Sequence, residues 1–216
     1  MKLLLADGDR IVGHKVGLTS KPMQQMLGLD SPDFAPVLES TVYADGAEVS
    51  VGSFIQPKIE AELMFVMGER LQGPGVTADD ARAAVSGVAA SMEIVDSRIV
   101  DWKIRLADTI ADLASCGAVA RSDRLVPLSE VDVQLVEMVF RRNGELVDNG
   151  AGRAALGDPL GVVAWLANTL GERGVALEPG QLIMTGALHA AVPMAAGEVY
   201  RAEFDRLGPV TVRVVD

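Results

Sequence analysis

Runs of apolar residues, with polar positions at regular intervals, predict several β-strands along the chain. Residues 11–18 (IVGHKVGL) are strand-like, with glycines where the backbone bends or approaches a neighbour closely. Residues 58–67 (KIEAELMFVM) are typical of a buried strand. The C-terminal part continues in this way, with strands and turns expected over LIMTGALHAAV (182–192), VYRAEF (199–204) and VTVRVV (210–215).

Helical spacing and capping residues predict helices between these strands. Thr77 and Asp80 have the spacing of a capping box, which opens a helix expected to continue through the small-residue run to Ser91. The mixture of helices and strands lacks the regular alternation of a doubly wound sheet and predicts an α+β fold. Three further helices are expected: residues 21–27, with Ser20 as N-cap and Gly28 as stop, residues 107–116, and residues 158–171.

Glycine and proline mark the expected connections. Residues 30–40 contain two prolines and are expected to form a loop, and residues 41–50 (TVYADGAEVS) a hairpin with its turn at Asp45-Gly46. The segment GAGRAALG (150–157) lacks the GxGxxG spacing of a dinucleotide site and is interpreted as a turn. Because no repeat, low-complexity tract or long linker occurs, residues 1–216 are expected to form one domain.

The charge balance narrows the range of partners. The chain has 19 Lys and Arg residues against 30 Asp and Glu residues, and its formal net charge of −11 disfavours nucleic acid and anionic membrane surfaces. No stretch reaches the roughly 18 apolar residues of a membrane span, and the N-terminal apolar run is too short for a signal peptide. The single Cys116 cannot form an internal disulfide. These features predict a cytoplasmic protein without a membrane or nucleic-acid partner.

Two acidic residues interrupt the apolar strand at 58–67. Because side chains alternate across a strand, Glu60 and Glu62 project from one face, about 7 Å apart. A solvated edge strand, with Lys58 as the ionic partner, explains them about as well as a buried site does. Glu93, in the apolar segment SMEIVDSRI, favours the site, since clustered carboxylates in apolar surroundings need a cation or a shared proton. Three carboxylates without a companion His or Cys are typical of a hard divalent ion such as Mg²⁺ or Mn²⁺.

Several segments are similar, in order, to segments of one enzyme family: GHKVGLTSKPMQQMLG, SPDF, QPKIEAELMFVMG, EIVDSRIVDWKI, ADTIADLASCG, LEPGQLIMTGALHAAVP and GEVYRAEFDRLGPV. Together they resemble the 2-hydroxypenta-2,4-dienoate hydratases (2-keto-4-pentenoate hydratases). These enzymes are grouped with the 4-oxalocrotonate decarboxylases in the fumarylacetoacetate hydrolase superfamily. The similarity covers nearly the whole chain after its first residues, and long matches in register are more specific than any single motif.

The resemblance implies a fold, an activity and a set of site residues. The fold would be a mixed, rolled β-sheet with helices packed outside, and the assembly a homo-oligomer. The activity would be metal-dependent addition of water to 2-hydroxypenta-2,4-dienoate, through its 2-oxo tautomer, to give 4-hydroxy-2-oxopentanoate in meta-cleavage catabolism of aromatic compounds. Glu60, Glu62 and Glu93 would bind Mg²⁺, and Lys15, Asp33, Leu63 and Ser115 would lie around the substrate.

Two features differ from the family pattern. Relatives usually have an additional helical segment before the position of Gly13. If that segment covers the site or builds a subunit contact in the relatives, the lid and the assembly of this chain are expected to differ. Relatives often have ADNAS where this chain has ADLAS (111–115). Leu113 there is expected to alter substrate preference without abolishing the chemistry.

Local sequence offers a simpler explanation for each remaining candidate. Lys15 and Asp33 are candidates for proton transfer, but a surface ion pair and an Asx-turn explain them too. Ser115 either contacts substrate or water, or packs in a helix of small residues. His189, in a Gly/Ala-rich turn, either lines the pocket and binds substrate or is a polar loop residue. Structural roles are expected for His14, for Cys116 and for an ion pair between Asp96 and Arg98.

Three functions fit these features. The first is hydration of a short 2-hydroxydienoate, and the second is decarboxylation of 4-oxalocrotonate with the same metal. A second carboxylate needs a cationic or polar contact, whereas a vinyl tail prefers apolar surroundings, so Leu113 mildly favours hydration. The third is a noncatalytic partner subunit in a complex with a related pathway enzyme. The three glutamates argue against it, because a binding subunit has no reason to keep three buried acids without their ion.

Overall fold

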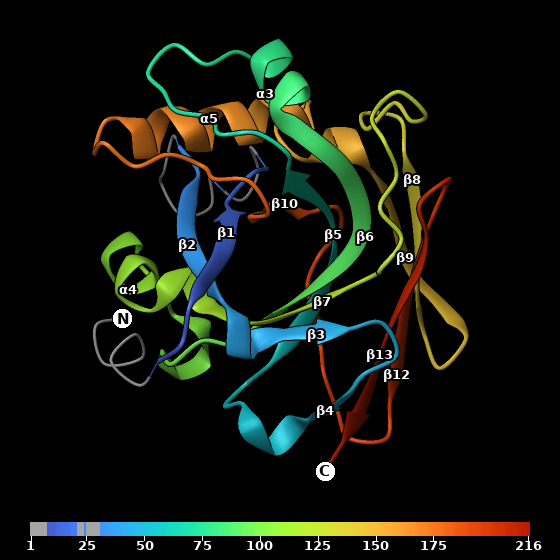
Figure 1. Ribbon diagram of the computed structural model, residues 1–216. Coiled ribbons are helices and arrows are strands. Elements are labelled where there is room, and N and C mark those ends of the chain that lie inside the picture. Colours follow the sequence, from blue (N-terminus) through green and yellow to red (C-terminus); the bar gives the residue numbers. More distant parts are fainter. Residues whose placement is uncertain (1–7, 21–23, 25–30) are drawn as a thin grey trace.

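A strongly curved mixed sheet is the centre of the fold in the computed structural model, which describes residues 8–20, 24 and 31–216 (Figure 1). Its strand order is β2-β1-β10-β5-β6-β7-β3, and the short β11 also pairs with β5. The β1–β10 and β3–β7 pairs are parallel and the other pairs antiparallel. The bounds are β1 (Ile11–Gly17), β2 (Asp33–Leu38), β3 (Val42–Ala44), β5 (Lys58–Met67), β6 (Val85–Val95), β7 (Cys116–Arg121), β10 (Leu182–Ala187) and β11 (Val192–Pro193).

A second sheet packs beside the first and shares its core (Figure 1). Its strand order is β4-β13-β12-β8-β9, with bounds β4 (Glu48–Ser50), β8 (Glu137–Arg142), β9 (Glu145–Ala151), β12 (Val199–Phe204) and β13 (Gly208–Val215). One hydrophobic cluster contains Leu63 and Phe65 of β5 together with Phe140 of β8, Tyr200 of β12 and Val212 of β13. Burial of these side chains fixes the two sheets against each other.

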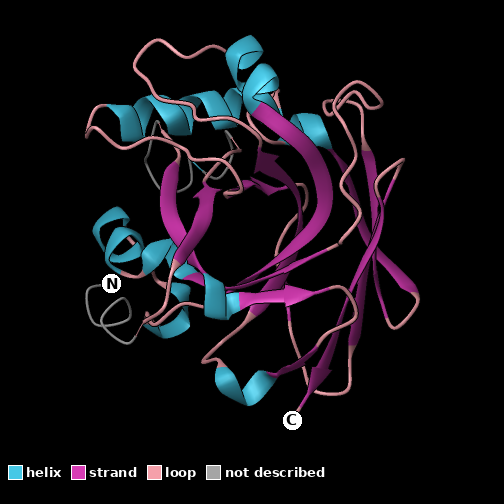
Figure 2. Cartoon of the chain, viewed as in Figure 1, coloured by secondary structure: helices cyan, strands magenta, loops and turns pink. Residues whose placement is uncertain are grey.

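The α-helices lie on the outside of the sheets (Figure 2). α3 (Ala78–Ala84) begins with the predicted capping box, in which Thr77 and Asp80 bond each other's backbone N–H. α4 (Leu106–Ala111) lies near β2, and α5 (Pro159–Gly171) begins at the Asp158 cap and packs against α3. Within the described residues, no helix has the length and apolar character needed to span a bilayer.

The strands predicted at 11–18, 58–67 and in the C-terminal part are confirmed, as is the helix at 158–171. The helix at 107–116 is shorter, because α4 ends at Ala111 and a 3₁₀ turn over Leu113–Ser115 leads into β7. Residues 21–23 and 25–27 of the first predicted helix, and Gly28 as its stop, lie outside the described residues.

The loop predicted at 30–40 is wrong, because Asp33–Leu38 forms β2. Pro36 in this segment cannot donate a ladder hydrogen bond, which argued against a strand. Among the described strands, β2 is an edge strand that pairs only with β1, and Pro36 lies opposite His14 in that pair. A proline is tolerated there because one side of an edge strand needs no partner.

The hairpin predicted at 41–50 is also wrong, although its turn is present. Gly46 has a φ of 78°, and the N–H of Ala47 bonds the carbonyl of Ala44. The flanking strands do not pair with each other: β3 joins β7 in the large sheet and β4 joins β13 in the small one. The turn therefore carries the chain from one sheet to the other.

The helix predicted from Thr77 to Ser91 ends at Ala84, and the small-residue run that follows is β6. β6 lies between β5 and β7, and ten of its eleven residues are buried. A strand covered on both faces has a continuous apolar sequence, so its periodicity does not separate it from a buried helix.

Candidate metal centre and active site

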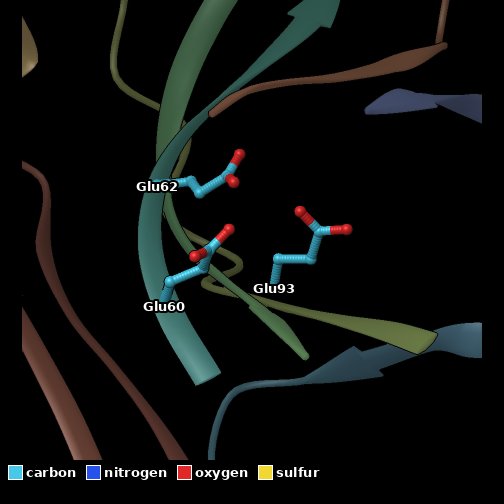
Figure 3. A group of neighbouring side chains, drawn as sticks. All are labelled: Glu60, Glu62 and Glu93. Carbon is cyan, nitrogen blue, oxygen red and sulfur yellow. The ribbon is translucent and has the colours of Figure 1, made fainter. Parts of the chain in front are cut away.

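Three carboxylates from two adjacent strands face one space (Figure 3). Glu60 on β5 lies directly opposite Glu93 on β6, and Glu62 follows two residues along β5 on the same face. Each offers one oxygen, and the three oxygens lie within 4.8 Å of one another. The solvated-edge alternative is wrong, because β5 is flanked by β10 and β6, and Glu62 and Glu93 are each 1% exposed.

The carboxylates destabilise one another without a cation. Burial, followed by repulsion from Glu93, raises the pKa of Glu60 to about 8. Burial and repulsion from both neighbours also raise the pKa of Glu62 well above its usual value. Glu62 Oε2 accepts a hydrogen bond from the N–H of Gly186 at 2.8 Å, whereas Oε1 has no hydrogen-bond partner among the described residues. An all-oxygen set with an unpartnered, buried oxygen fits a hard divalent ion.

These shifts predict the pH dependence of the metal-free protein. A carboxyl with a raised pKa in the folded state stabilises it below the unfolded pKa of 4.5, and this stability is lost as pH rises towards 8. The buried His14, with its pKa lowered to about 4, has the opposite effect but only below pH 6.5. In EDTA, the free energy of unfolding should therefore fall between pH 6.5 and 8, by up to about 1.4 kcal/mol per pH unit for each such carboxyl.

Thermal unfolding across this pH range, with and without Mn²⁺, measures the effect. The Tm in EDTA should fall with pH, and the Tm increase caused by Mn²⁺ should grow as the carboxyls ionise. A metal-free Tm that stays level or rises between pH 6.5 and 8 would contradict the buried, mutually repelling arrangement.

Lys15 provides a cation beside the carboxylates. It lies on β1, is 4% exposed, and its Nζ lies 3.2 Å from Glu93 Oε1. Burial alone would lower the pKa of Lys15, but the attraction of Glu93 and of neighbouring acidic groups outweighs this and raises the pKa above its usual value. Lys58, the ionic partner considered from sequence, instead has its Nζ 4.2 Å from the centroid of the Trp102 ring.

Asp33 lies next to Lys15 because β2 pairs with β1. Its Oδ2 accepts a hydrogen bond from Thr109 Oγ1 at 3.1 Å, while its buried Oδ1 has no hydrogen-bond partner among the described residues. Gly17 leaves room for this carboxylate: a Cβ there would lie 2.4 Å from Asp33 Oδ1 and 3.5 Å from Lys15 Nζ. The absence of a side chain at position 17 therefore fixes where the Asp33 carboxylate sits.

Gly17→Ala should displace the Asp33 carboxylate and lower kcat by about 10²-fold, the usual effect of a misplacement near 1 Å. A double-mutant cycle with Asp33→Ala separates this from a general packing defect. Once the carboxylate is absent, adding Gly17→Ala should cost little further rate. Additive losses in the double variant would contradict the assignment.

Ser115 lies at the end of a segment with unusual backbone angles. Leu113, Ala114 and Ser115 all have φ between 50° and 56°, a region that costs non-glycine residues energy and is common at functional sites. Ser115 Oγ donates to Asp112 Oδ2 at 3.3 Å. Arg98 bonds this same Asp112 at 3.2 Å. The ion pair predicted between Asp96 and Arg98 is therefore wrong: the Asp96 carboxylate accepts the N–H groups of Ile55 and Gln56 instead.

A cavity of about 280 Å³ brings most of these residues together. Lys15, Asp33, Glu60 and Ser115 line it, and its walls include the apolar side chains of Val95, Trp102 and Ile104. A second cavity of about 380 Å³ is lined by the turn at 188–191 and shares Glu60 and Gly17 with the first. Glu60 therefore lines both cavities and connects them to the other two carboxylates of the cluster, Glu62 and Glu93.

Leu63 and His189 are not directed at the carboxylates. The Leu63 side chain is fully buried in the hydrophobic core, on the face of β5 opposite Glu60 and Glu62. His189 belongs to the wall of the second cavity, but its imidazole Nε2 accepts the N–H of Ala61 at 2.9 Å. Neither geometry supports a direct side-chain contact with a substrate bound at the carboxylates.

His14 and Cys116 have the buried settings expected of structural residues. The His14 ring packs near Phe34, with ring centroids 6.4 Å apart. Burial, followed by the charge of Glu93, raises the pKa of Cys116 above its usual value, so it remains a thiol.

Thr109, Trp102 and Gly186 were missed as site residues by sequence reasoning. Thr109 donates a hydrogen bond to Asp33, and the backbone N–H of Gly186 donates one to Glu62. Trp102 lines the first cavity, and its ring lies under the ammonium of Lys58. The positive φ of Asp101 and Trp102 marks that wall as a strained segment. Only the tryptophan gave a signal in the sequence, as one of two tryptophans in the chain and placed between Asp101 and Lys103.

Comparisons with known proteins identify the family of this chain. Residues 10–215 match the family model described as fumarylacetoacetate (FAA) hydrolase C-terminal. A 2-hydroxyhexa-2,4-dienoate hydratase of Comamonas testosteroni is 41% identical over 100% of this chain and 83% of its own length. A 2-hydroxypent-2,4-dienoate hydratase of Pseudomonas putida is 47% identical over 80% of this chain and 78% of its own.

A solved structure extends the comparison to the fold. It is a 4-oxalocrotonate decarboxylase from Pseudomonas putida G7, complexed with magnesium and adipate, which superposes with a TM-score of 0.96 at 38% identity. The alignment covers 99% of this chain and 81% of that protein. The predicted fold class, a mixed rolled sheet with peripheral helices, is thereby confirmed. This chain belongs to the fumarylacetoacetate hydrolase family.

Proposed function

We propose that this protein is a hydratase that depends on Mg²⁺ or Mn²⁺ and adds water to 2-hydroxypenta-2,4-dienoate. The observation that carries the proposal is one cavity lined by Glu60 of the carboxylate cluster, by Lys15 and by Asp33, whose Oδ1 accepts no hydrogen bond within the described part of the chain. Relatives named for this kind of hydration are 41% and 47% identical over most of the chain. The physiological setting proposed is meta-cleavage catabolism of aromatic compounds.

The reaction requires two proton deliveries and one addition of water. In the first step the 2-hydroxyl of the dienoate loses its proton and C5 gains one, which gives the 2-oxo-3-enoate. In the second, the oxygen of water bonds to C4 and C3 gains a proton, which gives 4-hydroxy-2-oxopentanoate. An ion held by Glu60, Glu62 and Glu93 would supply Lewis-acid stabilisation of negative charge on the substrate's 2-oxygen.

The chain's own residues account for the proton transfers. Lys15 is an ammonium at neutral pH and can donate a proton, and each positioned acid or base contributes about 10²- to 10⁴-fold to the rate. Asp33 Oδ1, which has no hydrogen-bond partner among the described residues, can accept a proton from the substrate or from water. Ser115 lines the cavity, and its Oγ, whose proton goes to Asp112, can accept a hydrogen bond from the attacking water.

The cavity walls suit a short anionic substrate with a hydrocarbon tail. Val95, Trp102 and Ile104 offer apolar surface to the vinyl group. Lys15 and Lys58 both line the cavity and provide local positive charge in a protein of net charge −11. The two lysines and the apolar wall therefore favour a substrate with a carboxylate at one end and a hydrocarbon group at the other.

Decarboxylation of 4-oxalocrotonate is the second candidate. Lys58 lies in the cavity wall and offers a cation for a second carboxylate, and the similar decarboxylase binds the dicarboxylate adipate. Leu113, which favoured hydration on sequence grounds, does not line this cavity, whereas its neighbours Ala114 and Ser115 do. The stronger support for hydration is the identity to the hydratases.

Parallel assays test the two activities. Purified protein with Mg²⁺ is incubated with freshly made 2-hydroxypenta-2,4-dienoate and with 4-oxalocrotonate, and both absorbance loss and CO₂ release are followed. Absorbance loss with the dienoate, abolished by EDTA and restored by Mg²⁺, is the expected result. CO₂ release from 4-oxalocrotonate at a higher kcat/KM would overturn the hydratase assignment. No turnover of either substrate would favour the noncatalytic partner subunit.

The assembly and the location are also proposals. We propose a homo-oligomer in the cytoplasm that associates with a related pathway enzyme and binds a small anionic 2-oxo or 2-hydroxydienoate. Sedimentation velocity of the purified chain tests the first point, and a single species at the mass of one chain would contradict it.

A further inference from the structure

The hydrogen-bond ladder along β5 is interrupted next to the metal ligands. One edge of β5 pairs with β6. The other edge pairs first with β10, where Ala187 lies opposite Glu62, and then with β11, where Val192 lies opposite Ile59. The register shifts between Met184 and Ala187, and the turn at 188–191 separates the two partner strands. Ala61, between Glu60 and Glu62, therefore faces a turn where a strand would otherwise continue.

The turn supplies both hydrogen bonds that a strand would have given to Ala61. The N–H of Leu188 bonds the carbonyl of Ala61 at 3.0 Å. The N–H of Ala61 donates to Nε2 of His189 at 2.9 Å, so an imidazole nitrogen occupies the place of a backbone carbonyl. In the same segment, the N–H of Gly186 bonds Glu62 Oε2. Residues 186–189 thus hold β5 at consecutive points around the two glutamates.

The imidazole is held in this position by its surroundings. The His189 side chain is fully buried, and its ring lies against Phe140 with centroids 4.3 Å apart. Acceptance by Nε2 requires the ring proton on Nδ1, which has no hydrogen-bond partner among the described residues; Asp148 Oδ2 lies 4.0 Å from it, beyond hydrogen-bond distance. Burial lowers the pKa of His189, which keeps Nε2 free to accept.

We propose that His189 is a positioning residue for the metal ligands: its imidazole completes the β5 ladder at Ala61 and thereby fixes the directions of Glu60 and Glu62. Ligand oxygens tolerate only about 0.5 Å of displacement before a site weakens, and supporting residues typically contribute 10- to 100-fold to metal affinity. The inference rests on the proposed metal centre. It differs from a substrate contact, because Nε2 already accepts the N–H of Ala61 on β5.

Metal affinity of His189 variants, measured by Mn²⁺ titration and electron paramagnetic resonance, tests the proposal. His189→Phe keeps a ring against Phe140 but removes the acceptor, and should weaken Mn²⁺ binding by about 10- to 100-fold. His189→Gln places a carbonyl oxygen near the Nε2 position and should recover most of the affinity, whereas His189→Asn, too short to reach Ala61, should not. If His189→Phe does not fold, the difference in Mn²⁺ affinity between His189→Gln and His189→Asn tests the proposal.

Asn168→Leu is the matched control. Asn168 likewise holds a backbone segment, since its side chain bonds both the N–H and the carbonyl of Val76 at 2.9 Å, but it lies on α5 and lines neither cavity. It should lower the Tm and leave Mn²⁺ affinity unchanged. Amide exchange of Ala61 should accelerate only in the His189 variants that lack an acceptor.

The outcomes separate this inference from the proposed function. Equal Mn²⁺ affinity in wild type, His189→Phe and His189→Asn would overturn the positioning role and leave the metal centre intact. A wild-type protein that binds no Mn²⁺ would overturn the proposed function, and the inference with it.

Discussion

Glu62→Gln is expected to abolish hydratase activity through loss of the metal while stabilising the metal-free protein. The substitution removes one of three ligand oxygens and one negative charge, so Mn²⁺ affinity should fall by more than the roughly 10- to 100-fold usual for a supporting residue. The metal-free protein should gain stability, because burial and repulsion already raise the pKa of Glu62 and disfavour its ionised form. A gain of about 1 kcal/mol would raise the Tm by about 2–4 °C.

Mn²⁺ titration and thermal unfolding in EDTA measure the two effects of Glu62→Gln. Asp33→Asn is the matched control, since it removes a carboxylate charge from the neighbouring cavity wall without removing a proposed ligand. It should keep Mn²⁺ binding and lose rate. Full turnover and unchanged Mn²⁺ affinity in Glu62→Gln would eliminate the proposed centre.

Lys15→Met should have the second-largest effect, a loss of about 10²- to 10⁴-fold in kcat with metal binding retained. Methionine keeps much of the buried stem but cannot carry the proton. Removal of a cation 3.2 Å from Glu93 makes the cluster more negative, so affinity for a divalent ion should stay equal or rise. Steady-state kinetics at saturating Mn²⁺ and a direct Mn²⁺ titration check both parts.

Lys58→Met distinguishes proton transfer from mere positive charge. Lys58 lines the same cavity, but its Nζ lies against Trp102 and forms no ion pair with the carboxylates among the described residues. Its loss should raise KM for the anionic substrate more than it lowers kcat. Equal kcat losses in the two lysine variants would mean that Lys15 contributes charge alone.

The main errors of sequence interpretation concern which strands pair. The turn at Asp45-Gly46 was recognised, yet β3 and β4 belong to different sheets. A turn motif determines a local change of direction, whereas pairing depends on which distant strand offers an open edge. The hairpin of β8 and β9 was not predicted, although Asn143-Gly144, both with positive φ, gives a strong local signal for it.

Strand periodicity in the sequence determined much of the candidate site. Glu60 and Glu62 had to share a face because side chains alternate, and Glu93 had to be buried because its neighbours are apolar. That Lys15 lies against Glu93 required the order β1-β10-β5-β6, which no local pattern specifies. His189 illustrates the limit: its sequence indicated a polar turn residue at a pocket, but only the interrupted ladder shows that its ring is bonded to Ala61.

The amino-acid sequence alone thus specifies the chemical type of this protein: an acidic α+β chain with three carboxylates suited to a hard divalent ion, in segments that resemble a hydratase family. These features depend on residue type and on the period of a strand, which are local. The tertiary structure decided which cation faces the carboxylates, where Asp33 and Ser115 enter the cavity, and what holds β5 in place. Those contacts join residues far apart in the chain, and burial of the shared core, rather than local preference, selects them.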